Sequence, residues 1–148
     1  MPERSVRSIL HRRRFGSDLL SVRPDETVYD AARRMAENGC GSVLVVEDER
    51  LLGLFAERDL LVRVVAAGLD PARTPMREVM TMDPETIGAE EPVGEAIRRM
   101  ERGSFRHLVV VDGGRVLGVV STRDIPALAT GGMAKELDRR HRRAERVR

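Results

Sequence analysis

The fold is decided by two heptapeptides, Gly53-Leu54-Phe55-Ala56-Glu57-Arg58-Asp59 and Gly118-Val119-Val120-Ser121-Thr122-Arg123-Asp124. They lie 65 residues apart (118 − 53 = 65), and the same offset aligns the chain with itself from residue 28 to residue 60 without a gap. Apolar positions, charged positions and glycines recur together in this register. A gapless register of this length indicates a duplicated structural unit.

Each copy predicts the same order of elements, which is strand, helix, strand, strand and helix. In the first copy we expect strands at 19–22, 42–46 and 51–55, a helix from 28 that Gly39 stops, and a second helix from 59. Thr27 and Asp30 have the spacing of a capping box for the first helix. In the second copy we expect strands at 86–87, 108–111 and 116–120, a helix at 93–103 and a short helix from 124.

Composition is that of a folded globular chain, because 41% of the 148 residues are hydrophobic and 34% are charged. The single cysteine excludes an internal disulfide, and Cys40 is expected to be a small core residue. No apolar run approaches the roughly 18 residues that a membrane helix needs. The first residues lack the apolar segment of a secretory signal. We therefore expect a cytoplasmic protein without a membrane partner.

The repeats predict an α/β fold of two βαββα units related by pseudo-two-fold symmetry. A unit of about 45 residues cannot cover both faces of a three-stranded sheet, so the two copies should pack together. The predicted organisation is a first motif at 1–65, a Gly- and Pro-containing linker at 66–83, a second motif at 84–130 and a basic, helical tail at 131–148.

The two heptapeptides resemble the signature of CBS domains, the regulatory motifs named after cystathionine β-synthase. That signature is a glycine, two apolar residues, a serine or threonine, two variable residues and an aspartate at the start of a helix. The segment 76–81 resembles the lead-in to a CBS copy, and 105–110 resembles the family's second strand. The resemblance covers residues 5–128 and implies a stand-alone tandem CBS pair.

The resemblance implies a non-catalytic regulatory module that binds AMP, ADP, ATP or a related adenosyl ligand in clefts between the two motifs. No cofactor is required, although ATP would bring Mg²⁺ with it. With no catalytic domain attached, the module would form a homodimer and signal energy or ligand state to a regulated protein in trans.

The same resemblance assigns roles to ten residues. An aspartate at the first turn of a helix would accept the ribose hydroxyls, serine and threonine hydroxyls with the helix N-terminus would bind the α-phosphate, and cations would add charge. Apolar strand residues would sandwich the adenine. The ligand-binding residues are therefore Asp124, Ser121, Thr122, Arg123, Arg106, His107, Ile87, Asp59, Arg58 and Val22.

The two copies are not equivalent at these positions. The first copy has Ala56 in place of Ser121, Glu57 in place of Thr122, and Gly41-Ser42 in place of Arg106-His107. These differences remove a hydroxyl donor and add a carboxylate where a phosphate would bind. The second motif, at Asp124, is the preferred site.

Other interpretations of these residues remain open. Asp59 and Asp124 could act as helix caps, and Arg106 and His107 could be ordinary surface residues. An enzyme is not expected, because the sequence contains no recognisable catalytic or metal-binding motif.

The principal alternative function is nucleic-acid binding or scaffolding through the Arg-rich ends. Residues 1–14 (five Arg, one Glu: 5 − 1 = +4) and 135–148 (seven Lys and Arg, three Asp and Glu: 7 − 3 = +4) carry equal net charges. The apolar stripe Met133, Leu137, Ala144 and Val147 favours instead a tail helix that packs on a partner subunit. Nucleic-acid affinity would fall steeply with salt, whereas adenosyl recognition would fall less.

Overall fold

The computed structural model describes residues 4–10, 19–103 and 105–125. The chain divides into two compact units, and each is formed largely by one copy of the repeat. The first-repeat unit comprises residues 15–84, and the second-repeat unit comprises residues 1–14 together with 85–148. No helix in the described part of the chain is long and apolar enough to cross a membrane. The predicted tail at 131–148 and the Arg12-Arg13-Arg14 run lie outside the described residues.

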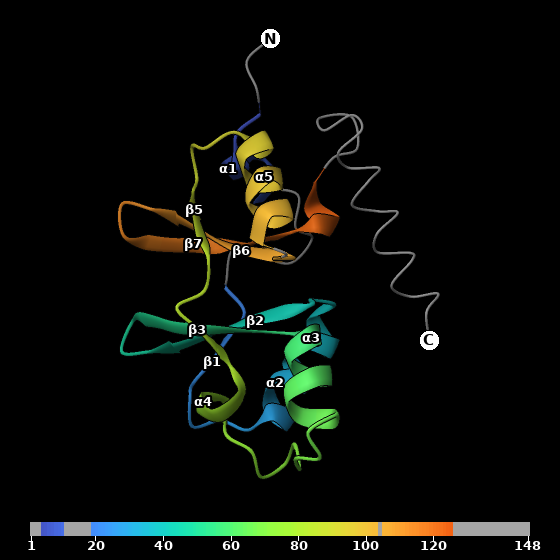
Figure 1. Cartoon of the computed structure of the whole chain (residues 1–148). Coiled ribbons are helices and arrows are strands. Elements are labelled where there is room, and N and C mark those ends of the chain that lie inside the picture. The colour runs from blue at the N-terminus through green and yellow to red at the C-terminus, as the bar shows by residue number, and fades with distance from the viewer. Residues whose placement is uncertain (1–3, 11–18, 104, 126–148) are drawn as a thin grey trace, which may run out of the picture. The chain divides into compact units, whose positions relative to one another are not determined.

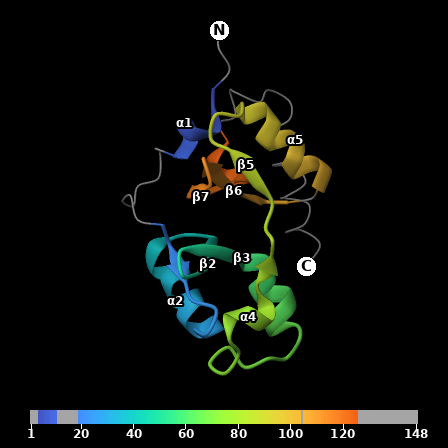
Figure 2. The same cartoon turned by 90° about the vertical axis from the view of Figure 1, so that its left-hand side faces the viewer.

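The first-repeat unit contains a four-stranded sheet in the order β1-β2-β3-β4. β1 is parallel to β2, and the other neighbours are antiparallel. Helices cover one face of this sheet (Figures 1 and 2). In chain order the elements are β1 (Ser21–Val22), α2 (Val28–Asn38), β2 (Ser42–Glu47), β3 (Arg50–Ala56), α3 (Glu57–Asp59), a π-helical segment (Leu60–Val65), α4 (Met76–Val79) and β4 (Thr81–Met82).

The second-repeat unit contains a three-stranded sheet in the order β5-β6-β7, with β5 parallel and β7 antiparallel to the central strand. Helices α1 and α5 lie on one face of it (Figures 1 and 2). In chain order the elements are α1 (Val6–Leu10), β5 (Thr86–Gly88), α5 (Val93–Gly103), β6 (His107–Asp112), β7 (Arg115–Ser121) and a 3-10 turn (Thr122–Asp124).

The first long helix begins and ends as the sequence predicts. The Thr27 hydroxyl accepts the Asp30 N–H at 3.2 Å, and an Asp30 carboxylate oxygen accepts the Thr27 N–H at 3.3 Å. This confirms the capping box, which satisfies two N–H groups that have no partner inside the helix. Gly39 ends α2 in the left-handed conformation with φ of 62°, where a Cβ would be strained.

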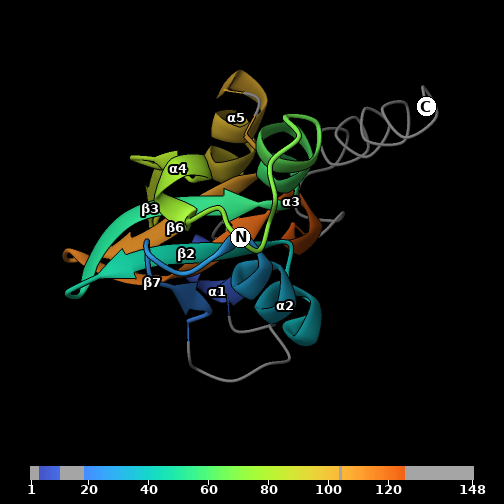
Figure 3. The ribbon, with the colours of Figure 1, turned by 90° about the horizontal axis from the view of Figure 1, so that it is seen from below.

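The two hairpins confirm the repeat at the level of register. The β2–β3 pair has an irregularity between Val45 and Val46, and β6–β7 has the same irregularity between Val110 and Val111. Figure 3 shows the β2–β3 hairpin face on. Its turn residues Asp48 and Glu49 have φ of 52° and 63°, and Gly113 and Gly114 in the other hairpin have φ of 56° and 82°. Positive φ at both central residues is typical of a type I′ turn, whose twist matches that of the flanking strands.

Part of the segment 66–83, which the sequence analysis describes as a linker, folds onto the first repeat. α4 inserts Met76 and Val79 into the first-repeat core with 0% and 2% of their surfaces exposed. β4 then pairs with β3, placing Thr81 opposite Leu54. The Gly and Pro residues that predicted a linker are confined to residues 66–75.

The N-terminal segment makes the equivalent contact with the opposite repeat. The sequence places residues 4–10 in the first motif, whereas in the structure α1 packs in the second-repeat unit with Val6 and Ile9 in its core. The hydrogen bond from Val6 N to Glu91 O (2.8 Å) corresponds to the one from Met76 N to Glu26 O (2.9 Å). The lead-in of each copy therefore completes the core of the other copy.

Ion pairs add to the docking of α1. Arg7 donates from Nε to Glu90 at 2.7 Å and from Nη2 to Asp112 at 2.5 Å. The hydrogen bonds that Arg7 donates to Glu90 and, with a smaller effect, to Asp112 raise the pKa of Arg7 above its ordinary value. The guanidinium is exposed to water, so its contribution to stability is small beside that of the buried side chains.

Candidate functional site

The second heptapeptide ends where β7 passes into the 3-10 turn. Ser121 is the N-cap of this turn, and its hydroxyl accepts the N–H of Arg123 at 3.2 Å. Asp124 Oδ2 accepts the backbone N–H of Ser121 at 2.8 Å and its hydroxyl at 3.3 Å. Asp124 therefore takes part in capping, as the helix-cap interpretation expects. Ser121 is the N-cap itself, and Asp124 is the third residue of the turn, which bonds back to the N-cap as in a capping box. A carboxylate offers about four lone-pair sites, so capping and ligand binding are compatible roles.

The start of β6 lies beside this turn. His107 is directly opposite Ser121 in the register of β6 and β7, and the carbonyl of Arg106 accepts the N–H of Thr122 at 3.1 Å. Arg106 is exposed and His107 is half-buried. The structure therefore brings together the six polar residues that the sequence assigned to the second motif, which are Arg106, His107, Ser121, Thr122, Arg123 and Asp124.

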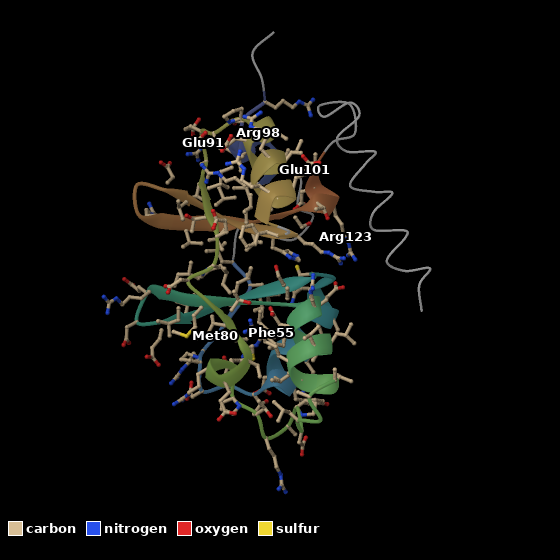
Figure 4. All side chains as sticks on the ribbon, viewed as in Figure 1. Phe55, Met80, Glu91, Arg98, Glu101 and Arg123 are labelled. Carbon is tan, nitrogen blue, oxygen red and sulfur yellow. The ribbon has the colours of Figure 1, made fainter. Side chains whose placement is uncertain are left out.

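Positive charge at this end of the sheet is accessible to solvent. Arg123 is exposed and projects from the turn, outside the core of the unit (Figure 4). Arg58 holds the corresponding position in the first-repeat unit and is exposed as well. Within the second-repeat unit, the hydroxyls of Ser121 and Thr122, the Asp124 carboxylate and the exposed guanidinium groups of Arg106 and Arg123 can recognise a ligand that carries both a diol and an anion.

The first heptapeptide has the same backbone arrangement with fewer side-chain donors. Ala56 is the N-cap of α3, and its N–H donates to Asp59 Oδ2 at 2.8 Å. The N–H of Glu57 donates to the carbonyl of Gly41 at 3.0 Å, matching the Thr122–Arg106 bond of the second repeat. Because Ala56 has no hydroxyl, the side-chain donor that Ser121 supplies is missing.

The other oxygen of Asp59 is engaged by two residues that the sequence analysis did not identify. The Thr81 hydroxyl donates to Oδ1 at 3.2 Å, and Arg63 Nε lies 3.6 Å from the same atom. Arg63 also donates from Nη1 to the carbonyls of Val79 at 3.3 Å and Met80 at 2.9 Å. The four-residue spacing from Asp59 to Arg63 could have indicated the ion pair. No local signal identifies Thr81, which arrives through the pairing of β4 with β3.

The side chains of Val22 and Ile87, which the resemblance places against the adenine, lie in the cores of the two units. Val22 is 2% exposed and packs in the first-repeat core, and Ile87 is 1% exposed and packs in the second-repeat core. Both residues point towards the helix-covered face of their sheet, while Ser21 and Thr86 beside them are exposed. Their side chains stabilise the core of each unit.

No group of three or more His, Cys, Asp or Glu side chains is arranged to hold a metal ion in the part of the chain that the structure describes. Hydrogen bonds from the guanidinium groups of Arg99 and, with a smaller effect, Arg98 lower the pKa of Glu95 on α5. These contacts stabilise the helix surface.

Comparison with known families agrees with the repeat. The family model described as CBS domain matches residues 6–66 and again residues 76–126. The chain belongs to the CBS domain family. The second CBS match begins at residue 76, so the family pattern includes α4 and β4, whereas the sequence analysis began the second motif at 84.

Curated relatives contain the CBS pair within longer chains. The CBS domain-containing protein CBSCBSPB1 of Arabidopsis thaliana is 38% identical over 117 residues, which is 77% of this chain and 22% of the relative. The arabinose 5-phosphate isomerase KdsD of Francisella tularensis is 34% identical over 113 residues, covering 76% of this chain and 34% of the relative. This chain thus spans about a third or less of the length of these two relatives.

Solved CBS structures match the chain over nearly its whole length. A CBS domain protein of Pyrobaculum aerophilum, solved in complex with AMP, has a TM-score of 0.71 and 26% identity, and the match covers 90% of this chain and 98% of that chain. The fold is therefore the mixed α/β fold of a CBS pair, with one sheet in each of the two compact units.

Proposed function

We propose that this chain is a non-catalytic regulatory module that binds an adenine nucleotide at its second CBS motif. One observation carries the proposal, which is the convergence of the Asp124 carboxylate, the Ser121 hydroxyl and the start of β6 at one strand end. The AMP complex of the Pyrobaculum aerophilum protein supports the choice of ligand. AMP, ADP and ATP share the adenosine moiety and a phosphate, so each satisfies this chemistry.

In this proposal Asp124 accepts one or both ribose hydroxyls. Hydrogen bonds to an ionised carboxylate are among the stronger ones in proteins, at roughly 1.5–3 kcal/mol each. Ser121 and Thr122 donate to the α-phosphate, and Arg106, Arg123 and His107 supply charge on the phosphate side. With Val22 and Ile87 in the cores, the adenine edge is left to backbone groups. ATP would be accompanied by Mg²⁺, bound through its phosphates.

A ligand panel tests the proposal on the intact chain. AMP, ADP and ATP should raise the melting temperature, whereas guanine and pyrimidine nucleotides should raise it much less. At a hundredfold excess over the dissociation constant, binding adds about 2.7 kcal/mol to the free energy of unfolding. Asp124→Ala should reduce the shift more than Arg115→Ala, a matched change at the exposed start of the same strand. No shift with any adenosyl compound at millimolar concentration would refute the proposal.

We propose further that the module acts in trans as a homodimer in the cytoplasm. The residues after α3 in the first-repeat unit carry three exposed apolar side chains at a spacing of four, with Leu61 49%, Val65 62% and Leu69 41% exposed. Val62 is 52% exposed beside them. Leu61 and Val65 belong to the π-helical segment and Leu69 follows it. Exposed apolar side chains close together in the chain are typical of protein contacts, and a second copy of the chain would bury them. Leu61→Glu should convert the dimer to a monomer in light scattering, whereas Arg58→Glu should not.

A further inference from the structure

The turn at the second heptapeptide and the helix α1 share one hydrophobic core. Val120 lies directly before residues 121–124 and Ile125 directly after them, so apolar side chains flank both ends of the turn. Val120 belongs to the core cluster of the second-repeat unit, and half-buried Ile125 packs against the same cluster. α1 inserts Val6 and Ile9 into this cluster with 0% and 1% of their surfaces exposed. The turn and α1 therefore support each other through common neighbours.

α1 can be a helix only while it is docked. It contains five residues, and helices this short are not stable in isolation. Its N–H groups bond to the second-repeat unit, with Val6 donating to the carbonyl of Glu91 at 2.8 Å and Arg7 donating to the carbonyl of Ala89 at 2.9 Å. A segment with so few contacts opens more readily than the strands behind it. α1 is therefore an element with two states, docked and released.

α1 and the ligand-binding side chains at this strand end lie on opposite faces of the sheet. Successive side chains of a strand point to opposite faces. Leu108 and Val120 point into the core on the face that α1 and α5 cover (Figure 2). Their neighbours His107 and Ser121, which lie opposite each other in the register, therefore point to the other face. Any effect of α1 on a ligand at these side chains has to pass through the core.

The first-repeat unit has the same arrangement. Leu60 follows Asp59 directly and packs against the core cluster of that unit. This cluster receives Met76 and Val79 from α4, the lead-in of the other copy. Each heptapeptide is thus followed by a side chain that packs on the core which an exchanged lead-in completes. The arrangement belongs to the repeat and does not depend on one local contact.

We propose that nucleotide binding at residues 121–124 is coupled to the docking of α1, so that the nucleotide holds the N-terminal segment on the second-repeat unit. The inference rests on the function proposed above and adds the element that responds to the ligand. Contacts of the ligand with the turn fix the backbone that leads into Ile125, and a fixed Ile125 stabilises the core that receives Ile9. Because the coupling is reciprocal, release of α1 weakens nucleotide binding by the same factor. Ile125 and Ile9 act through the core and contact no ligand.

Amide hydrogen exchange measured by NMR tests the coupling in the intact chain. The N–H groups of Val6 and Arg7 report the docking of α1, because their acceptors lie on the rest of the unit. The Val109 N–H donates to the carbonyl of Glu85 at 2.9 Å inside the sheet and reports the opening of the whole unit. Without AMP, the α1 amides should exchange faster than Val109, and saturating AMP should slow them about fivefold or more.

Two results of this measurement would overturn the coupling and leave nucleotide binding intact. One is that AMP binds and the exchange rates of the α1 amides do not change. The other is that the α1 amides exchange at the same rate as Val109 both with and without AMP, because α1 would then open only together with the whole unit.

A charge-matched pair of variants tests the reciprocal effect. Ile9→Asp places a carboxylate in the core and releases α1, whereas Ser8→Asp adds the same charge at an exposed position of the same helix. Calorimetric titration with AMP should show affinity lowered about fivefold or more by Ile9→Asp and kept within about twofold by Ser8→Asp. Circular dichroism checks that each variant is folded, and the exchange measurement on the wild type depends on neither variant. Equal AMP affinities of the two folded variants would overturn the coupling, and a wild type that binds no AMP would refute both the coupling and the proposed function.

Discussion

Substitution of Ile9 tests whether the segment before each repeat completes the core of the other repeat. Ile9 lies on α1, is 1% exposed and contacts the core of the second-repeat unit, although about 80 residues of chain separate it from most of that core. Ile9→Ala removes three carbons, which is about 2.4 kcal/mol of transfer free energy at roughly 0.8 kcal/mol per group. The cavity that remains adds to this, so the free energy of unfolding should fall by about 3–4 kcal/mol.

Urea denaturation followed by circular dichroism measures the change, with Ser8→Ala as the matched control on the same helix. Ser8 is exposed and its hydroxyl donates to the carbonyl of Ser5 in the same helical turn, so its substitution should stay within about 0.5 kcal/mol of the wild type. A loss below 1 kcal/mol for Ile9→Ala would show that α1 does not complete this core and would refute the exchange of lead-ins.

Three further stability predictions are checked by the same denaturation assay. Gly114→Ala should lower the free energy of unfolding by about 1 kcal/mol, because alanine is strained at the positive φ of this residue. Glu49 holds the equivalent position of the other hairpin with a positive φ and is not a glycine, so Glu49→Ala should change the free energy of unfolding little. Equal effects of the two substitutions would contradict this prediction. Gly53→Ala should lower the free energy of unfolding by about 1–3 kcal/mol, because its Cβ would lie 2.7 Å from the Thr81 carbonyl oxygen. An unchanged free energy of unfolding would show that β4 does not pair closely with β3. Thr27→Ala should cost about 1 kcal/mol by removing the capping box, and a loss under 0.3 kcal/mol would show that the cap contributes little.

Features encoded by neighbouring residues could be predicted from the sequence. The α2 helix follows from its apolar spacing, its capping box and Gly39, and the Asp112-Gly113-Gly114 turn follows from the φ values that only small residues adopt readily. The grouping of Asp124 with Ser121 follows from their three-residue spacing. The pairing of β6 with β7 then places Arg106 and His107 beside them.

The features that were missed depend on partners distant in sequence. β4 has only two residues, so no periodicity distinguishes it from a linker. α4 has only four residues, so its sequence alone does not show which side chains are buried. The two-residue strand β1 likewise contains too little alternation to predict that Val22 faces inward, and Ile87 in the three-residue strand β5 presents the same problem. Thr81 reaches Asp59 across 22 residues of sequence, a separation that no local rule spans.

The hydrogen bond between Thr81 and Asp59 lies on the covalent route between the two CBS repeats. β4 ends at Met82 and β5 begins at Thr86, so three residues join the segment that Asp59 holds to the first strand of the second repeat. A ligand signals only if it binds one conformation better than another, and coupling free energies of about 1–3 kcal/mol are usual. A conformational change that starts in the second repeat would reach β4 through those three residues, where strand pairing and the Thr81–Asp59 hydrogen bond resist it.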